Sequence, residues 1–365
     1  METPSTPPAV IPSQARAARF HAPGDVRIET VPVPAPGPGE VLVRVLAATT
    51  CGTDLKAYRR GHFMLGTLPA PFGHEYAGEI VAIGAGVRRW QPGMRVVGAN
   101  SAPCGHCFFC AREQPSQCEN LRFWNGAYAE YALIPRRIVA RNLYLVPDSI
   151  NPAAAALAEP LACALHGVEA AWVVNDDVVL IVGDGPLGLL LLAAARLRGA
   201  RVIMLGHHAE RLALTRKWGA ESVFDTTGDD TLERTAGDLL EQCNEGHGAD
   251  VVFEAVGRPE TWDLALTLAR PGGTVCLFGG RAHGDTVTVD AHALHYEERM
   301  IVGAFHHTPR TFARAVEAIV SREVPAGDLL SGDVPLEGLV DAFTRLARGE
   351  GIKYAIRPLP PATAP

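Results

Sequence analysis

The pattern of hydrophobic and polar positions along the chain changes near residue 160. Before it, short apolar runs such as 41–45 and 79–83 alternate with turns rich in glycine and proline, as at 36–39. Short runs separated by such turns are typical of a compact, mostly antiparallel β structure. We therefore expect residues 17–160 to form a β-rich domain.

Beyond this point the rhythm becomes strand, helix, strand, helix. Apolar runs at 178–182, 201–205 and 274–278 predict buried strands, and a helical stretch ending near Leu197 follows the first of them. Alternation of this kind predicts a parallel, doubly wound sheet. The fold class is therefore α/β, with residues 161–304 as the second domain.

The two ends of the chain follow a different pattern. Residues 1–16 are rich in proline, serine and threonine and residues 358–365 are rich in proline, so we expect both segments to be disordered. Residues 305–357 contain two amphipathic helical patterns and a last strand at 352–356. We expect this segment to complete the first domain, which is then discontinuous in sequence.

Composition and charge narrow the possible functions. The chain has 365 residues, of which 47% are hydrophobic and 20% charged, and its formal net charge is −7. This balance is that of a soluble globular protein, and the negative charge gives no electrostatic reason to bind nucleic acid or anionic membranes. No apolar run approaches the roughly 18–20 residues that span a bilayer, and no signal peptide is evident. We expect a cytoplasmic protein without nucleic-acid or membrane partners.

A glycine motif follows the first strand of the second domain. The pattern G-x-G-x-x-G is formed by Gly183, Gly185, Pro186, Leu187 and Gly188, with Asp184 after the first glycine. The motif follows a buried strand and opens a helix, which is the context that dinucleotide binding requires. The glycines permit a tight turn, close approach of the backbone to a pyrophosphate and close helix packing. A glycine-rich turn without a ligand is the alternative, and the context favours the cofactor.

The next strand ends where cofactor preference is decided. An NAD-preferring site carries an acidic residue there for the ribose 2′-hydroxyl. This chain has Gly206, His207 and His208 instead, with Arg211 close behind. The missing carboxylate removes repulsion against a 2′-phosphate, so we favour NADP over NAD. The alternative is that these residues are only polar groups of a surface loop.

Four of the eight cysteines lie close together, namely Cys104, Cys107, Cys110 and Cys118. Four thiolates at such spacing can close a tetrahedral zinc shell without an open position, and the metal then folds a loop too small for its own core. An iron–sulfur cluster or a redox dithiol is the alternative. We expect a structural zinc lobe at residues 101–120.

A second set of metal ligands is spread along the first domain. Cys51 follows a strand, His74 and Glu75 precede another strand, and Glu159 stands at the approach to the second domain. Thiolate, imidazole and carboxylate groups are together compatible with zinc, although each residue alone is more often structural. Three protein ligands and one open position are what a catalytic zinc needs.

In this order, the segments around Cys51 and His74, the four-cysteine lobe, the segment around Glu159 and the glycine motif resemble the zinc-containing medium-chain alcohol and polyol dehydrogenases. The sorbitol, threonine and glucose dehydrogenase branch is the most similar, over roughly residues 17 to 357. The resemblance implies a GroES-like catalytic domain, a Rossmann domain, one catalytic and one structural zinc, and a homodimer or homotetramer. It also implies hydride transfer between NAD(P) and a secondary alcohol of a polyol, sugar or cyclitol, which becomes a ketone.

The resemblance assigns roles to the ligands of the reactive zinc. Cys51 and His74 bind the metal directly, and either Glu75 or Glu159 completes the shell, so the third ligand stays open. We expect Asp54 to orient His74 from behind.

The route of the substrate proton departs from the family pattern. Thr53 matches the hydroxyl that passes the proton away from the substrate. Three residues later many relatives carry a histidine, but this chain has Lys56. The proton therefore leaves through the ribose and solvent, or through Lys56.

Further positions complete the expected site. Lys353 matches a cationic position that contacts the cofactor pyrophosphate. His306 and His307 stand where polyol dehydrogenases carry cleft residues, one of them an arginine, which suggests a substrate other than sorbitol. Three aromatic residues are candidates for the substrate side, with core packing as the alternative: Tyr58, Phe123 and Trp124.

Four rival functions differ from this interpretation. A non-enzymatic relative of the lens crystallin kind and a zinc-free quinone reductase would both have lost zinc ligands, and none is missing here. An epimerase or lyase that uses the cofactor transiently stays open, as does a simple secondary-alcohol dehydrogenase.

Overall fold

The structure, a computed structural model, describes residues 10–228, 233–281 and 283–359. The chain contacts divide it into two compact units, one at each side of residue 160. Unit 1 runs to Glu159 and resumes at Phe312, while unit 2 extends from Pro160 to Thr311. Among the described residues, no helix combines the length and the apolar character needed to cross a bilayer.

The chain returns to unit 1 later than the sequence suggests. The expected return was at residue 305, but the second segment of unit 1 begins at Phe312. Phe312 lies in α10 (Pro309–Val320) and is fully buried, with its ring centroid 5.6 Å from that of Tyr144 in unit 1. Burial of this apolar side chain therefore sets the boundary.

The ends of the described chain are ordered where we expected disorder. Residues 1–9 and 360–365 lie outside the described residues. The first strand, however, already includes residues 14–16, and Pro358 is buried. The guanidinium of Arg16 donates to the carbonyl of Pro358 at 3.0 Å. The expected disorder is thus wrong for 14–16 and 358–359, because composition does not reveal such long-range hydrogen bonds.

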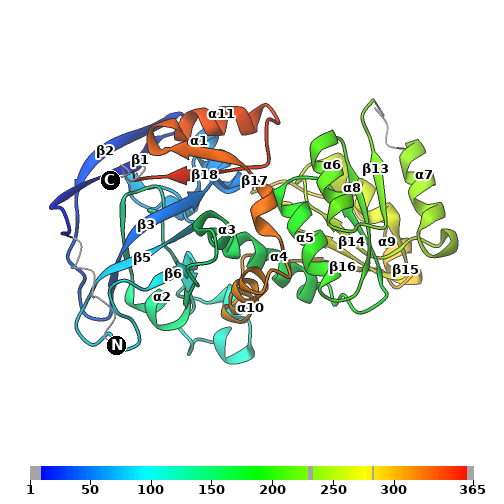
Figure 1. Cartoon of the computed structure of the whole chain (residues 1–365). Helices are drawn as coiled ribbons and strands as arrows, with labels where there is room; N and C mark the ends of the chain where they lie inside the picture. Colours follow the sequence, from blue (N-terminus) through cyan, green and yellow to red (C-terminus); the bar gives the residue numbers. More distant parts are fainter. Residues whose placement is uncertain (1–9, 229–232, 282, 360–365) are drawn as a thin grey trace. The chain divides into compact units, whose positions relative to one another are not determined.

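Unit 1 is built on a mixed sheet whose path is β10-β6-β5-β3-β18-β17, with β9 paired to β3. Its strands are β3 (Val41–Thr49), β5 (Tyr76–Ile83), β6 (Arg95–Gly98), β9 (Tyr131–Ile134), β10 (Leu143–Leu145), β17 (Leu330–Pro335) and β18 (Lys353–Arg357). The C-terminal strand β18 pairs antiparallel with β3, so the last segment completes a sheet begun near the N-terminus (Figure 1).

Smaller sheets and short helices surround this sheet. The small sheets consist of β1 (Gln14–Ala22), β2 (Asp25–Pro32) and β4 (Ala70–Pro71), and of β7 (Ser101–Ala102) with β8 (Arg122–Phe123). The helices are α1 (Gly52–Arg60), α2 (Arg136–Arg141), α3 (Pro152–Ala156) and α11 (Leu339–Ala347), with the short 3-10 helix η1 (Phe63–Leu65). The core of unit 1 contains the fully buried rings of Phe20, Phe72, Tyr76, Tyr128 and Phe343.

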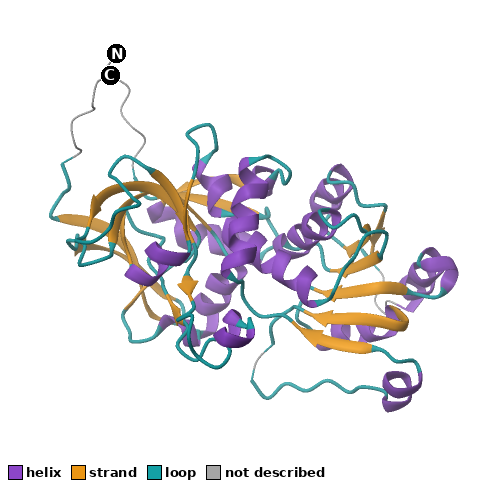
Figure 2. Cartoon of the chain, turned by 90° about the horizontal axis from the view of Figure 1, so that it is seen from below, coloured by secondary structure: helices purple, strands orange, loops and turns teal. Residues whose placement is uncertain are grey.

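Unit 2 contains the predicted parallel sheet, in the order β13-β12-β11-β14-β15-β16. Its strands are β11 (Val178–Val182), β12 (Arg201–Gly206), β13 (Ser222–Asp225), β14 (Ala249–Glu254), β15 (Ala269–Leu277) and β16 (Met300–Gly303). The helices that flank it are α5 (Pro186–Arg196), α6 (Ala209–Lys217), α7 (Glu233–Gln242), α8 (Pro259–Leu268) and α9 (Ala291–Tyr296) (Figure 2).

The order of these strands places a ligand site. All neighbouring strands run parallel, and the order reverses between β11 and β14. In sheets of this kind ligands bind outside the carboxyl ends of the strands at that reversal. The glycine motif lies there because it directly follows β11, and the predicted α/β doubly wound fold is confirmed.

Candidate active site and cofactor site

Cys51 begins helix α1 and presents its thiol at the helix N-terminus. It is the N-cap residue, with extended backbone angles, and its Sγ accepts a hydrogen bond from the amide of Thr53 at 3.4 Å. The partial positive charge of a helix N-terminus stabilises a thiolate. The local sequence therefore places the Cys51 sulfur at the start of α1, where a metal ion could reach it.

His74 precedes β5, and Asp54 of α1 orients its ring through Nδ1. Its Nδ1 lies 2.9 Å from Asp54 Oδ1, and both side chains are buried. Because the carboxylate only accepts hydrogen bonds, Nδ1 carries the proton and Nε2 is left as a ligand atom. The expected contact between Asp54 and His74 is thus present.

Tyr128 fixes Asp54 in turn, which the sequence did not reveal. Its hydroxyl donates to Asp54 Oδ2 at 2.6 Å and lies 3.1 Å from the carbonyl oxygen of Thr49. Burial and the nearby Asp54 carboxylate raise the pKa of Tyr128 well above its usual value, so the hydroxyl keeps its proton. No spacing signal connects Tyr128 with Asp54, because the two residues meet only through the tertiary fold.

Glu75 is fully buried next to His74 and is held by two groups. Its Oε1 accepts from Lys353 Nζ at 2.8 Å, and its Oε2 accepts from the Thr49 hydroxyl. Lys353 belongs to β18 and is only 3% exposed. The Lys353 ammonium is thus bound to Glu75 inside unit 1, while its expected contact with the cofactor pyrophosphate stays a prediction.

Glu159, in the first turn of α4 (Ala158–Ala170), is the second carboxylate of this region. It is 5% exposed. Burial, with the Glu75 carboxylate, outweighs the attraction of His74 and raises the pKa of Glu159 to about 7. The Glu159 carboxyl group therefore interacts electrostatically with both His74 and Glu75.

The donor atoms of Cys51, His74 and Glu75 all lie within 4.8 Å of one another. Burial works against a charged imidazole, but Asp54 and Cys51 outweigh it and hold the pKa of His74 well above its ordinary value. Asp54 and Cys51 thus stabilise a positive charge at the position of His74. A partly buried thiol, a buried imidazole and a buried carboxylate, with Asp54 bonded to the far nitrogen of the imidazole, fit a zinc ion.

The four-cysteine lobe also fits a zinc ion. Sγ of Cys104 lies 3.9 Å from Sγ of Cys110, and Sγ of Cys107 lies 3.8 Å from Sγ of Cys118. A tetrahedral ion with zinc–sulfur bonds of about 2.3 Å holds its thiolates about 3.8 Å apart. All eight cysteines are free, so the lobe is not closed by disulfides.

Helix α1 carries the residues of the expected proton route. Thr53 is partly buried and Lys56 is exposed. His62, which the sequence did not single out, follows α1 and caps η1 by accepting from the amide of Met64 at 3.3 Å. Burial and the nearby His74 lower the pKa of His62, which places this imidazole within electrostatic reach of the candidate metal site.

The three expected substrate-side aromatic residues differ in their surroundings. The ring of Tyr58 lies 5.8 Å from that of Phe343, in the core of unit 1. Trp124 packs on the same core and donates from Nε1 to the carbonyl of Leu133 at 2.9 Å. Both therefore have packing roles, whereas Phe123 makes an edge contact with the exposed ring of Phe63 at 6.1 Å.

The glycine motif fits a dinucleotide. Gly183 has φ +113°, which favours glycine, and a Cβ on Gly188 would collide with the carbonyl of Gly183. Around Gly185 a Cβ would meet nothing within 4 Å, so its backbone faces open space. Gly185 caps α5 without a side-chain hydrogen bond and Pro186 follows, leaving the helix N-terminus available to phosphates.

Asp184 of the same motif holds the turn that follows β12. Its Oδ2 accepts from the amides of His207 and His208 at 3.1 and 2.7 Å, and it is 3% exposed. Donor atoms of these three residues lie within 4.8 Å of one another. However, Nη1 of Arg211 lies 3.4 Å from Nδ1 of His208, and this fixed positive charge disfavours a metal ion.

His306 and His307 belong to unit 2, and their rings lie 3.8 Å apart. His306 has φ +64°, an uncommon conformation for a residue with a side chain. His307 is 3% exposed.

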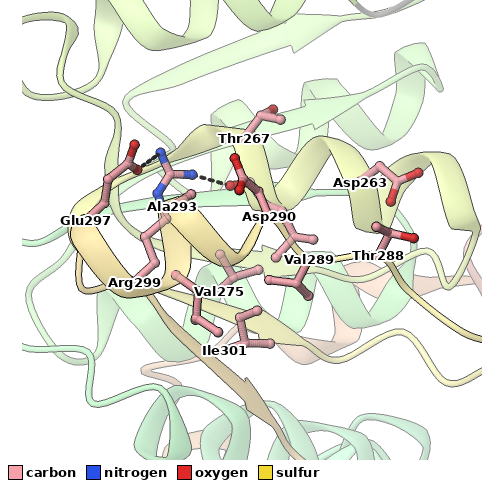
Figure 3. A pocket seen from close by; sticks show the side chains of 12 residues that line it. Asp263, Thr267, Val275, Thr288, Val289, Asp290, Ala293, Glu297, Arg299 and Ile301 are labelled. Atoms are coloured by element: carbon pink, nitrogen blue, oxygen red, sulfur yellow. Dashed lines mark hydrogen bonds and ion pairs between the residues drawn. The ribbon is translucent and has the colours of Figure 1, made fainter.

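A cavity of about 560 Å³ lies elsewhere in unit 2, between α8, α9, β15 and β16. Arg299 and Glu297 form an ion pair of 2.6 Å at its side (Figure 3). None of its lining residues belongs to the glycine motif or to the ligand groups described above.

Known proteins share these features. Residues 37–148 match the alcohol dehydrogenase GroES-like domain family, and residues 186–321 match the zinc-binding dehydrogenase family. The erythritol/L-threitol dehydrogenase of Mycolicibacterium smegmatis is 31% identical over 95% of this chain and 99% of its own length. The sorbitol dehydrogenase of Bacillus subtilis is 29% identical over 95% and 98%.

A solved structure agrees with these matches. A zinc-binding dehydrogenase from Sinorhizobium meliloti, solved with NADP bound, has a TM-score of 0.85 and 31% identity, covering 95% of this chain and 100% of its own. Identity at this level over almost the whole chain shows the family as well as the fold. The chain therefore belongs to the zinc-containing medium-chain alcohol and polyol dehydrogenases, enzymes that use a nicotinamide cofactor.

Proposed function

We propose that this dehydrogenase oxidises a secondary alcohol of a polyol, sugar or cyclitol to the ketone, with NADP as the favoured hydride acceptor. The observation that carries the proposal is the group of Cys51, His74 and Glu75, whose donor atoms lie within 4.8 Å of one another. One catalytic zinc at this group and one structural zinc at the four-cysteine lobe complete the proposed enzyme.

Cys51, His74 and a glutamate would hold the catalytic zinc. The distances favour Glu75 as the third ligand, and Glu159 is the second candidate. When bound, zinc supplies Lewis-acid polarisation that lowers the pKa of a substrate hydroxyl. Asp54 orients the His74 ring, while Lys353 and Thr49 hold the Glu75 carboxylate in place.

The proton of the substrate hydroxyl leaves by way of Thr53, in the first turn of α1. Thr53 takes it first, as its place beside Cys51 suggests. Lys56 is a poor next acceptor, since an ammonium group has donors only. His62 is not a better one, because its Nδ1 already accepts from the amide of Met64 and the neutral ring then carries its proton on Nε2. The proton therefore passes from Thr53 to the cofactor ribose and solvent.

Two observations support the cofactor and substrate choices. Gly206 stands where an acidic residue would bind the ribose of NAD, and the relative from Sinorhizobium meliloti carries NADP. The two curated relatives act on erythritol, threitol and sorbitol, which are all polyols. His306 and His307 replace the arginine expected for sorbitol, which points to a different polyol. The family resemblance supports a homodimer or homotetramer.

A substrate panel tests this function. Polyols, sugars, cyclitols and simple secondary alcohols are assayed with NADP and NAD, before and after removal of the metal by a chelator and its replacement by zinc. We expect turnover on polyhydroxylated substrates, loss on chelation and recovery with zinc. Full activity of the metal-free protein would contradict the proposal. Turnover without net change in nicotinamide absorbance would indicate an epimerase or lyase instead.

Metal content gives an independent test. We expect two zinc ions per chain by mass spectrometry, one in Cys51→Ser and two in Cys243→Ala. The control changes a buried thiol that belongs to no ligand group. Two zinc ions in Cys51→Ser would show that Cys51 is not a ligand.

A further inference from the structure

Glu254 stands at the carboxyl end of β14, and its side chain is fully buried. Its Oε1 accepts from the amides of Val256 and Gly257 at 2.9 and 2.7 Å and from the Thr261 hydroxyl at 2.7 Å. Its Oε2 is buried as well and has no hydrogen-bond partner among the described residues. Because an unpartnered buried oxygen costs free energy, the stability of unit 2 does not account for a glutamate at this position.

Glu254 joins the two loops that follow β14 and β15. Its side chain holds the first loop through the two amides, and its backbone carbonyl accepts from the amides of Phe278 and Gly279 in the second loop at 3.0 and 2.8 Å. The loops lie against each other. A Cβ on Gly257, which has φ +83°, would lie 2.9 Å from the carbonyl oxygen of Gly280. A Cβ on Gly279 would lie 2.4 Å from Glu254 Oε2. One buried residue therefore fixes the shape of both loops.

The loop after β14 also borders the glycine motif. The amide of Ala255 donates to the carbonyl of Val182, at the end of β11, at 2.9 Å. A Cβ on Gly183 would lie 2.6 Å from Cγ2 of Val256, an apolar side chain that is 38% exposed. Through this loop, Glu254 determines where an exposed apolar group stands beside the motif.

The order of the strands indicates which half of a dinucleotide meets these loops. The order reverses between β11 and β14, and each half of a doubly wound sheet takes one mononucleotide, with the pyrophosphate at the helix after the first strand. The ribose of the adenosine half lies at the end of the second strand, which here is β12. The nicotinamide half therefore extends toward the carboxyl ends of β14 and β15.

We propose that Glu254 is a positioning residue for the nicotinamide half of the cofactor. It is buried and acts through the loops after β14 and β15, which form the surface against which that half binds. This inference rests on the proposed function in one respect, that a dinucleotide lies at the glycine motif. Removal of the carboxyl group should weaken binding of the nicotinamide half and leave binding of the adenosine half unchanged.

Binding measurements on the zinc-loaded enzyme test the proposal without turnover. The dissociation constant of NADPH is measured by nicotinamide fluorescence, and that of adenosine 2′,5′-bisphosphate, which lacks the nicotinamide half, by calorimetry. In Glu254→Ala we expect NADPH to bind about tenfold more weakly than in the native protein, with unchanged affinity for the fragment. A merely structural role would weaken both ligands, so the difference between them isolates positioning.

Three further variants sharpen this test. Glu254→Gln still offers an oxygen to the loop amides, so it should keep most of the NADPH affinity that Glu254→Ala loses. Glu260→Ala removes an exposed glutamate from the first turn of α8 and is the matched control, which should change neither affinity. Gly257→Ala crowds the carbonyl of Gly280 while the Glu254 side chain stays present, and it should weaken NADPH in the same selective way.

The outcomes distinguish this inference from the proposed function. Equal losses for NADPH and the fragment in Glu254→Ala, or an unchanged NADPH affinity, would overturn the inference. If Glu254→Ala does not fold, Gly257→Ala decides: a selective loss supports the inference and equal losses overturn it. A native protein that prefers NADH contradicts only the NADP preference, and NADH with ADP then gives the same comparison. Absence of binding of either nucleotide to the native protein would overturn both.

Discussion

Lys353 and Glu75 form a buried ion pair that joins the last strand of the protein to the candidate metal site. Lys353 Nζ lies 2.8 Å from Glu75 Oε1, and the two residues are 278 positions apart in the sequence. Burial works against the ammonium, but Glu75 and Cys51 outweigh it and raise the pKa of Lys353, so the ammonium keeps its charge. The carboxylate beside His74 is therefore held by a strand from the other end of the chain.

Removing one partner of this pair should destabilise unit 1 strongly. Lys353→Met leaves the Glu75 carboxylate buried without its counter-charge, and we expect a loss of about 3–5 kcal/mol in the free energy of unfolding. Urea unfolding of the zinc-free protein measures it. Arg345→Ala is the control, since its partner Asp341 is exposed and such pairs contribute up to about 1 kcal/mol. Equal losses in both variants would show that the buried pair has no special role.

The contact of Asp54 with His74 should control zinc affinity. Asp54→Asn keeps the size of the side chain but removes the charge that orients and polarises the imidazole. We expect zinc affinity at this site to fall about 10–100-fold. Competition with a chromophoric chelator measures the change, and Asp341→Asn, on an exposed face of α11, should have no effect. An unchanged affinity in Asp54→Asn would remove Asp54 from the metal site.

The two metal groups should behave independently. Cys107→Ser breaks the four-cysteine group, so we expect one zinc ion per chain and increased proteolytic cleavage between residues 104 and 118. The fold of that loop depends on its metal because it has too little apolar surface of its own. Cys51→Ser should lose the other zinc and leave the loop resistant to protease. Loss of both zinc ions from either variant would contradict separate sites.

The raised pKa of Glu159 predicts how stability changes with pH in the metal-free protein. The carboxyl titrates at about 7 in the folded state and at 4.5 in its ordinary state. Between these values the folded protein holds a proton that the unfolded chain has released. The free energy of unfolding therefore falls as the pH rises from 4.5 to 7, by about 3 kcal/mol in total.

The variant Glu159→Gln should lose this pH dependence. Urea unfolding of the chelated native protein and of the variant at pH 5 and pH 8 gives the comparison. We expect the variant to be relatively more stable at pH 8, because it has no buried carboxyl to ionise. The same pH dependence in both proteins would mean that Glu159 titrates normally.

The crowding between Asp184 and Gly206 predicts how cofactor affinity changes when an acidic residue, as in NAD-preferring sites, replaces Gly206. Gly206→Asp alone should weaken both NADPH and NADH, because its Cβ would stand 2.5 Å from Asp184. The double variant Asp184→Gly with Gly206→Asp removes the clash and places a carboxylate at the strand end, so it should prefer NADH. Fluorescence titration with both nucleotides measures this. A preference for NADH in Gly206→Asp alone would show that the turn can rearrange.

The sequence by itself determined the features that short spacing encodes. Strand and helix periodicity placed the glycine motif after β11, and the four cysteines lie close in sequence, so both groups follow from local geometry. The proximity of Cys51 and Asp54 could be predicted in the same way, since Cys51 caps α1 and Asp54 lies in the first turn of that helix.

Only the tertiary structure decided which distant groups meet. The contacts of Lys353 with Glu75, of Tyr128 with Asp54 and of Asp184 with His208 join separate elements. Strand register and core packing set these distances, and neither is encoded in residue spacing. For the same reason the sequence offered two glutamates as third ligand, while the fold brings Glu75 to within 4.8 Å of Cys51 and His74.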